Sequence, residues 1–196
     1  MIKLYVFKGS VNSQRTRIVL EEKKIPHELV FLDREKKEHK KPEILALNPY
    51  GKVPILVEDG VVLYESCIIN EYLDETHPEP ALMPKDAAQR ARIRIMMDYT
   101  TTRFPPPMLA LRDVAGKDPA AAATHKETLK SLLAPVEAAI GDRSHVLGTG
   151  FTLADVALIP WALRFESLGV LPDPAFPNLL RWLAAMKERP SVKATS

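Results

Sequence analysis

The sequence predicts two domains, an α/β domain followed by an all-helical domain. Three observations lead to this prediction. Strand and helix patterns alternate through residues 1–77, as they do in an α/β layer. Residues 78–86 hold three prolines and little periodicity, which is typical of a semi-rigid linker. Residues 87–196 are helical in nearly all of their remaining pattern, so we expect an all-α domain there.

The predicted α/β domain is built from short apolar runs separated by turn signals. Pro26 ends the first helical pattern, because proline lacks an amide proton and clashes with the preceding turn. Asp59-Gly60 stands between two apolar runs and is a strong hairpin signal. The expected strands cover residues 2–7, 27–32, 54–57 and 61–64, and the expected helices cover residues 14–24, 42–47 and 66–75.

The predicted helical domain carries two strong local signals. Pro105, Pro106 and Pro107 must end or sharply kink the helix before them. Thr152 and Asp155 have the spacing of a capping box, in which the threonine bonds forward and the aspartate reaches back. The expected helices cover residues 87–104, 119–140, 152–168 and 178–189.

Composition argues against several classes of function. The chain has 27 basic and 25 acidic residues, so we expect no general attraction to nucleic acid. The only cysteine is Cys67 and the five histidines lack metal-ligand spacing, so neither a disulfide framework nor a metal is expected. No apolar run reaches membrane-spanning length and the N-terminus lacks a signal peptide's apolar core. We therefore expect a cytoplasmic protein with no membrane partner.

Residues 48–66 carry the most functional information. Pro54 heads an apolar strand, where a missing donor is tolerated. A cis Val53–Pro54 bond would in addition turn the N–H and C=O of Val53 outward, ready to pair with an extended peptide. Glu65 and Ser66 stand where the next helix begins. They could simply cap it, or Ser66 and the helix N–H groups could bind a carboxylate while Glu65 holds an ammonium group.

Three polar residues lie between the first strand and the first helix, namely Ser10, Asn12 and Ser13. They could form a polar N-cap, or one hydroxyl could donate to a thiolate and lower its pKa. Cys67 also lies near a helix start, but apolar residues flank it, so we expect it to pack. The cluster of charges from Asp33 to Lys41 mixes both signs, which is typical of a solvated loop or helix face.

Together these segments resemble the cytosolic glutathione S-transferase family over the whole chain. The resemblance is carried by residues 39–56 (HKKPEILALNPYGKVPIL), 63–66 (LYES) and 151–158 (FTLADVAL). The first of them is similar to the phi-type pattern of that family. The resemblance implies a thioredoxin-like N-terminal domain, a short linker and the family's all-helical C-terminal domain. It also implies that the capping box serves folding rather than catalysis.

The resemblance further implies a glutathione site. Val53 would pair its backbone with the cysteinyl part of glutathione, beside a cis Pro54. Glu65 and Ser66 would hold the γ-glutamyl end. The residues expected near the glycine carboxylate are His39, Lys40 and Lys52.

The resemblance also nominates a catalytic hydroxyl. Ser10, Asn12 and Arg17 have the spacing of many bacterial members, so Ser10 is expected to bond the thiolate. Members that place the serine nearer the arginine would nominate Ser13, or put Asn12 at the site. The loop lacks the cysteine of omega- and beta-type members and the S-S-C pattern of zeta-type isomerases. The resemblance therefore implies conjugation of glutathione rather than thiol–disulfide reduction.

The implied reaction is attack of the glutathione thiolate on a small, hydrophobic electrophile bound between the domains. Ordinary helix packing is the alternative role for the residues expected to line that pocket. The resemblance also implies a homodimer, with glutathione as co-substrate and no metal. The expected pocket residues are Arg103, Phe104, Met108 and Trp161.

A second class of function is also open. Residues 45–48, 64–75 and 80–84 resemble stringent starvation protein A, a bacterial relative associated with RNA polymerase. On that hypothesis the chain is a non-catalytic interaction protein with a vestigial glutathione site. The retained His39 and Lys40 and the polar loop after the first strand favour the enzyme.

Overall fold

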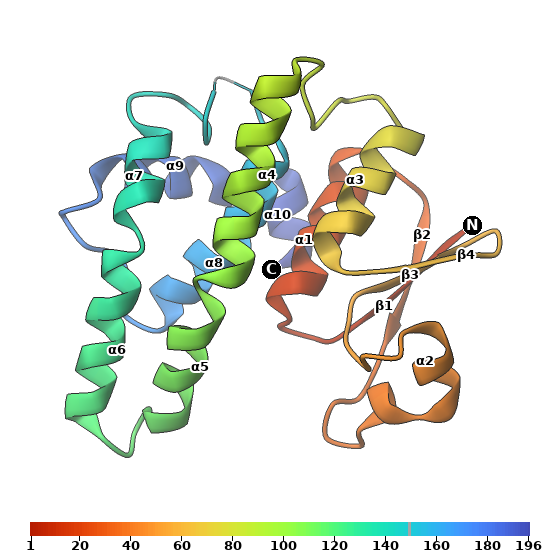
Figure 1. The fold of residues 1–196 in the computed structure, drawn as a ribbon, viewed down its shortest axis with the longest axis horizontal. Helices are drawn as coiled ribbons and strands as arrows, with labels where there is room; N and C mark the ends of the chain where they lie inside the picture. The colour runs from red at the N-terminus through yellow and green to blue at the C-terminus, as the bar shows by residue number, and fades with distance from the viewer. Residues whose placement is uncertain (149) are drawn as a thin grey trace. The chain divides into compact units, whose positions relative to one another are not determined.

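The computed structural model describes residues 1–148 and 150–196. The chain forms two compact units (Figure 1). Unit 1 comprises Met1–Ala81 together with Arg189–Ser196, and unit 2 comprises Leu82–Glu188.

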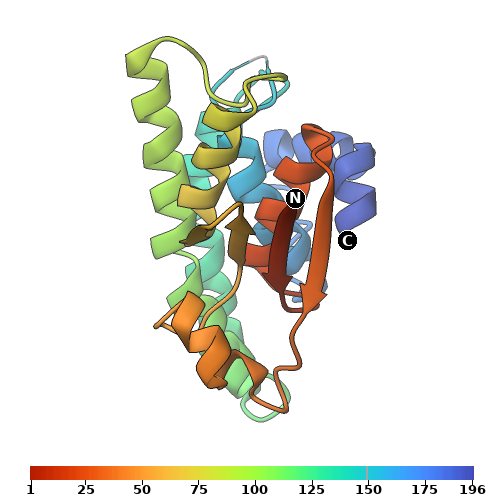
Figure 2. The same ribbon diagram turned by 90° about the vertical axis from the view of Figure 1, so that its right-hand side faces the viewer.

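Unit 1 is built on a four-stranded sheet with the order β2-β1-β3-β4. β1 (Ile2–Val6) pairs in parallel with β2 (His27–Phe31) and antiparallel with β3 (Ile55–Glu58). β3 and β4 (Val61–Tyr64) form the expected hairpin. In Figure 2, β1 and β2 both point down, toward the end of the sheet where the orange α2 lies.

The helices of unit 1 complete a thioredoxin-like fold, as predicted. α1 (Val11–Glu22) and α3 (Ser66–Thr76) pack against each other, and Figure 1 shows them side by side. A short 3-10 helix, η1 (Glu38–Lys40), leads into α2 (Pro42–Leu47). Apolar side chains from β1, β3, α1 and α3 form the core of this unit. The fully buried ones include Leu4, Val6, Ile18, Leu20, Ile55, Leu56, Ile69 and Leu73.

The C-terminal helix α10 (Pro190–Thr195) belongs to unit 1 because it packs on α1. The Arg189 guanidinium donates two bonds to the carboxylate of Glu22, at 3.0 and 2.7 Å. Arg17 donates to two carbonyl oxygens near the end of α10, at 3.1 and 3.2 Å. Residues 189–196, which the sequence assigned to the helical domain, are thus held on the N-terminal unit by polar contacts between distant segments.

Lys23 fixes the chain where it leaves α3. Its buried ammonium lies 2.7 Å from a carboxylate oxygen of Asp74. It also donates to the carbonyl oxygens of His77 and Pro80, each at 2.7 Å. A buried charge is costly unless it is paired and hydrogen-bonded, and all three donors of this ammonium have an acceptor. The first residues of the predicted linker are therefore tied to unit 1.

The elements of unit 2 that the structure describes are helices, as predicted. α8 is buried from Leu153 to Ala162, which fits a helix that is apolar on nearly every side. The predicted capping box is confirmed, with Thr152 and Asp155 bonded as expected. The helices are α4 (Ala87–Thr102), α5 (Pro105–Val114), α6 (Pro119–Ser131), α7 (Ala134–Ile140), α8 (Leu153–Ser167) and α9 (Pro177–Lys187).

Two features of unit 2 differ from the predicted helices. α4 ends at Thr102, before the three prolines, but the same prolines then begin α5, which was not predicted. Proline is tolerated in the first turn because an N–H there has no helical partner. The predicted helix over 119–140 is two helices, α6 and α7, and the second again begins with a proline in its first turn.

Two further findings bear on function. Among the described helices, none is both long enough and apolar enough to cross a membrane. Within residues 1–148 and 150–196, no three His, Cys, Asp or Glu side chains gather in a way that could hold a metal ion.

Candidate functional site

The sheet register brings four loops to one end of unit 1. Tyr5 pairs antiparallel with Ile55, so the chain that follows β1 runs beside the chain that precedes β3. Ile55 also pairs with Tyr64, which places the start of α3 at the same end. β2 is parallel to β1, and the N–H of Leu32 donates to the carbonyl of Val6 at 2.9 Å. The loops that begin at this end carry Ser10, His39, Val53 and Glu65.

Ser10 is the N-cap of α1. Its Oγ accepts the backbone N–H of Ser13 at 3.2 Å, and its carbonyl accepts the N–H of Gln14 at 2.9 Å. A hydroxyl oxygen that accepts a hydrogen bond keeps its own proton to donate. Because the side chain is only half-buried, Ser10 can cap the helix and donate to an anion at the same time.

The two alternative residues are placed differently. Ser13 is 1% exposed, and its Oγ accepts the backbone N–H of Phe7 at 3.4 Å. Asn12 is exposed, and its Oδ1 accepts from the guanidinium of the buried Arg15 at 3.1 Å. Ser10 is thus the partly exposed hydroxyl of the three residues, which makes it the best candidate for bonding a thiolate.

The segment before β3 presents a free stretch of backbone. The Val53–Pro54 peptide bond is cis, which confirms that expectation. In the part of the chain that the structure describes, no residue bonds the backbone N–H or C=O of Val53. The buried Asn48 side chain holds the turn before it, because it donates to the carbonyl of Lys52 at 2.9 Å and accepts the backbone N–H of Tyr50 at 3.0 Å. An extended peptide could pair with Val53 as an added strand.

The start of α3 is a second polar feature at this end. Glu65 is exposed and has a φ of 70°, an unusual value for a residue with a side chain. It provides no side-chain cap, and among the described residues the N–H groups of Ser66, Cys67 and Ile68 have no acceptor. Such N–H groups and the helix dipole favour a carboxylate. Backbone outliers of this kind cluster at ligand sites.

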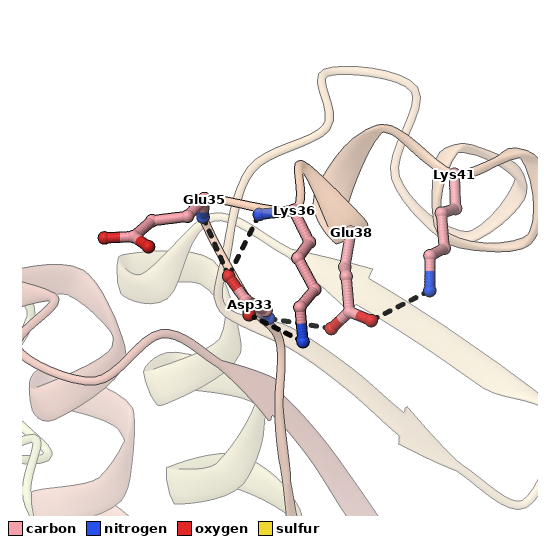
Figure 3. Close-up of polar contacts among 5 residues, drawn as sticks. All are labelled: Asp33, Glu35, Lys36, Glu38 and Lys41. Carbon is pink, nitrogen blue, oxygen red and sulfur yellow. Dashed lines mark hydrogen bonds and ion pairs between the residues drawn. The ribbon is translucent and has the colours of Figure 1, made fainter.

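The loop from Asp33 to Lys41 is ordered by its own charges, as Figure 3 shows. The Asp33 carboxylate accepts the N–H groups of Lys36 (3.0 Å) and Glu35 (2.8 Å), and these bonds, that of Lys36 first, lower its pKa. Glu38 accepts the N–H of Asp33 at 2.8 Å and pairs with Lys41 at 2.8 Å. These bonds between charged side chains and the backbone therefore hold the conformation of the loop that carries His39 and Lys40.

His39 and Lys40 are held at the end of this loop. The His39 ring meets the Phe7 ring edge to face, with 5.1 Å between centroids. Burial and then the cations Lys40, Arg34 and Lys37 hold the pKa of His39 below its ordinary value. Lys40 donates from Nζ to the carbonyl of Tyr50 at 3.2 Å, which joins this loop to the turn before Val53.

Gly51 is needed where the two loops meet. It has a φ of 58°, and a Cβ there would lie 2.6 Å from Lys40 Nζ and 3.0 Å from the carbonyl oxygen of His39. We expect Gly51→Ala to lower the free energy of unfolding by about 2–3 kcal/mol, from left-handed backbone strain plus crowding. Urea denaturation followed by circular dichroism measures this loss.

Gly60→Ala is the matched control. Gly60 has a φ of 88°, but a Cβ there would meet nothing within 4 Å. This variant should lose only the conformational part, about 1–2 kcal/mol. Equal losses in the two variants would show that the close approach of Lys40 and His39 to Gly51 does not matter.

The remaining candidates are placed as follows. Lys52 is exposed at the turn. In unit 2, Arg103 is exposed and Met108 is half-buried, so both could meet a small molecule. Phe104 is 0% exposed and meets Trp161 edge to face (5.9 Å between centroids), and Trp161 is itself buried. These two side chains therefore pack the core of unit 2 and could affect a bound electrophile only through that packing.

Cys67 packs, as expected. Burial raises the pKa of its thiol, and the nearby buried Arg15 opposes this shift only in part. A thiol held in its neutral form is a poor nucleophile. Sequence reasoning did not assign Phe7 a role in the site, because an aromatic residue at the end of a strand is expected in the core.

Comparisons with known proteins identify the family. Residues 9–76 match the family model described as "Glutathione S-transferase, N-terminal domain". Residues 119–185 match the model described as "Glutathione S-transferase, C-terminal domain". The chain belongs to the glutathione S-transferase family.

Individual relatives carry the names of different kinds of protein within this family. Maleylacetoacetate isomerase of Pseudomonas aeruginosa is 36% identical over 92% of this chain and 88% of its own. A stringent starvation protein A homolog of Coxiella burnetii is 31% identical over 100% of this chain and 91% of its own. A solved glutathione transferase of Burkholderia graminis, with two glutathione molecules bound per subunit, is 27% identical. It covers 99% of this chain and 86% of its own, with a TM-score of 0.86.

Proposed function

We propose that this protein is a glutathione transferase that joins the thiolate of glutathione to a small, hydrophobic electrophile. One observation carries the proposal, namely that three features for binding a peptide thiol lie at one end of the sheet. These are the free backbone of Val53, the uncapped start of α3 at Ser66, and the donor hydroxyl of Ser10. Their places follow from the strand register.

Each part of glutathione has a matching group in this proposal. The cysteinyl backbone pairs with the N–H and C=O of Val53, as a strand added to the sheet. The γ-glutamyl carboxylate lies at the N–H groups that begin α3, with Ser66, and its ammonium group meets Glu65. The glycine carboxylate faces the cationic loop that holds His39 and Lys40.

The chemical step needs only a lowered thiol pKa. The Ser10 hydroxyl donates to the sulfur and favours the thiolate over the thiol. A fall of about two pKa units corresponds to roughly 2.7 kcal/mol of preferential thiolate stabilisation. The thiolate then forms a bond to the electrophilic carbon. The electron pair that this displaces leaves with a leaving group such as halide, or moves to the epoxide oxygen or the enolate of an unsaturated carbonyl, which takes up a proton from water. Arg103 and Met108 are the proposed contacts of the electrophile.

Conjugation is proposed in preference to isomerisation. The isomerase of Pseudomonas aeruginosa is a relative at 36% identity, but the loop here has Ser10, Val11 and Asn12 in place of an S-S-C sequence. The protein is also proposed to act as a homodimer, which light scattering coupled to size-exclusion chromatography would establish or refute.

A non-catalytic interaction protein is the second candidate. The observation that favours it is the 31% identity to a stringent starvation protein A homolog over 100% of this chain. Such a protein could keep the fold and parts of the site without turnover.

A conjugation assay separates the two candidates. Purified protein is mixed with glutathione and an activated aryl halide, and formation of the thioether is followed by absorbance above the uncatalysed rate. Saturable turnover supports the enzyme. Absence of turnover with aryl halides, epoxides and α,β-unsaturated carbonyls, in protein shown to be folded, supports the interaction protein instead.

A further inference from the structure

An arginine that no sequence pattern nominated stands beside the proposed glycine end of the site. Arg34 lies on the loop after β2, and its Cζ is 4.6 Å from the centroid of the Phe7 ring. The His39 ring meets the same ring edge to face, at 5.1 Å between centroids. Phe7 therefore contacts both a permanent cation and a histidine.

Phe7 also connects this pair to the proposed catalytic loop. Its carbonyl accepts the N–H of Ser10 at 3.3 Å, and its N–H donates to Oγ of Ser13 at 3.4 Å. The backbone of Phe7 thus fixes the loop with the thiolate donor, while its ring contacts the Arg34 guanidinium and the His39 ring.

Three other cations of the region already have partners within the protein. The ammonium group of Lys40 donates a hydrogen bond to the carbonyl of Tyr50 at 3.2 Å. Lys36 and Lys41 pair with Asp33 (3.4 Å) and Glu38 (2.8 Å) within the loop. Arg34 is exposed, and stacking on an aromatic ring leaves the edge of its guanidinium, with its N–H groups, free to bond an anion.

We propose that Arg34, positioned by the Phe7 ring, is a specificity residue that binds the glycine carboxylate of glutathione together with His39. The inference rests on the proposed function and adds to it. A guanidinium can grip a carboxylate through two parallel N–H bonds, so the site selects thiol peptides that end in a free carboxylate. The Nδ1 atom of His39 is buried and has no hydrogen-bond partner among the described residues, and in this proposal the His39 ring supplies the second contact to the carboxylate.

The test compares two ligands and measures their dissociation constants by isothermal titration calorimetry. One ligand is glutathione, and the other is its glycine ethyl ester, which lacks the negative charge at that end. For the wild-type chain we expect the ester to bind about tenfold more weakly. We expect Arg34→Gln to raise the dissociation constant of glutathione about five- to tenfold and that of the ester less than twofold, because the lost interaction is with the glycine carboxylate.

Three further variants sharpen the comparison. Lys36→Gln removes an equal charge two residues away and should leave the preference for glutathione over the ester unchanged. Phe7→Leu keeps an apolar side chain but removes the aromatic face, and should reproduce the selective loss. Arg34→Lys keeps the charge without the planar guanidinium, so its dissociation constant for glutathione should lie between those of the wild type and Arg34→Gln.

Each remaining outcome overturns a specific statement. If the wild type binds glutathione but does not distinguish it from the ester, no carboxylate contact exists and the inference is wrong. If Arg34→Gln weakens both ligands equally, Arg34 has only a structural role. If the folded wild type binds neither ligand, the proposed function itself fails, and the inference with it.

Discussion

Replacing Ser10 with alanine is expected to lower kcat/KM for glutathione conjugation about 10- to 100-fold at pH 7. The variant loses the donor that stabilises the thiolate, so less of the bound glutathione is ionised. A rise of about two units in the thiol pKa, to an ordinary value of about 8.5, would reduce the thiolate fraction at pH 7 roughly 25-fold, and the higher nucleophilicity of a more basic thiolate would offset part of that. The assay is the initial rate of thioether formation at varied pH, in which the pKa on the pH–rate profile should rise.

A structural effect of the same change must be separated from the chemical one. Ser10 caps α1, and loss of a serine cap costs about 1 kcal/mol of stability. The pKa of enzyme-bound glutathione, read from thiolate absorbance, is not moved by a modest loss of stability. Asn12→Ala is the matched control, because Asn12 is exposed in the same loop, and its pKa readout should match the wild type. Full turnover by Ser10→Ala would disprove the assignment of Ser10.

Replacing Asp155 with alanine is expected to lower the free energy of unfolding of unit 2 by about 3–5 kcal/mol. The carboxylate is 0% exposed and accepts the N–H groups of Val146 and Thr152, each at 2.9 Å. It also accepts the indole N–H of the buried Trp182 at 2.8 Å. The variant leaves three donors without an acceptor, and each unsatisfied buried donor costs about 1–3 kcal/mol. Thermal and urea denaturation, followed by tryptophan fluorescence, measure the loss.

Two companion variants identify the cause. Asp142 is an exposed carboxylate of the same unit, and Asp142→Ala should change stability by less than about 0.5 kcal/mol. Asp155→Asn keeps an acceptor oxygen and most of the side-chain volume, so its free energy of unfolding should lie between those of the wild type and Asp155→Ala. A loss below about 1 kcal/mol in Asp155→Ala would mean that the three bonds do not hold unit 2 together.

Local signals were strong enough to predict most of the fold. Asp59-Gly60 specified its hairpin, because few other dipeptides adopt the backbone that such a turn needs. Thr152 and Asp155 specified the start of α8 through side-chain bonds within one turn. The local structure of residues 48–66, which carry much of the candidate site, was predictable for the same reason, since they contain their own turn, strand and helix signals.

Features that depend on distant segments were not predictable. Nothing local to residues 189–196 indicates that α10 packs on α1, which depends on Arg189 meeting Glu22. The role of Phe7 depends on Arg34 and His39 arriving from the loop after β2. The three prolines from Pro105 show that the preceding helix must end. They are equally compatible with the first turn of a new helix, and whether one forms there depends on what the following residues pack against.

The central claim is that the end of the sheet in unit 1 holds glutathione. The most direct test is isothermal titration of glutathione into the full chain, beside Glu65→Gln and its control Glu43→Gln, an exposed carboxylate on α2. We expect one saturable site per chain with a Kd below about 1 mM, equivalent to roughly 4 kcal/mol or more of binding free energy. Glu65→Gln should weaken binding and Glu43→Gln should not. No saturable binding to the folded chain, or equal binding by both variants, would contradict the site described above.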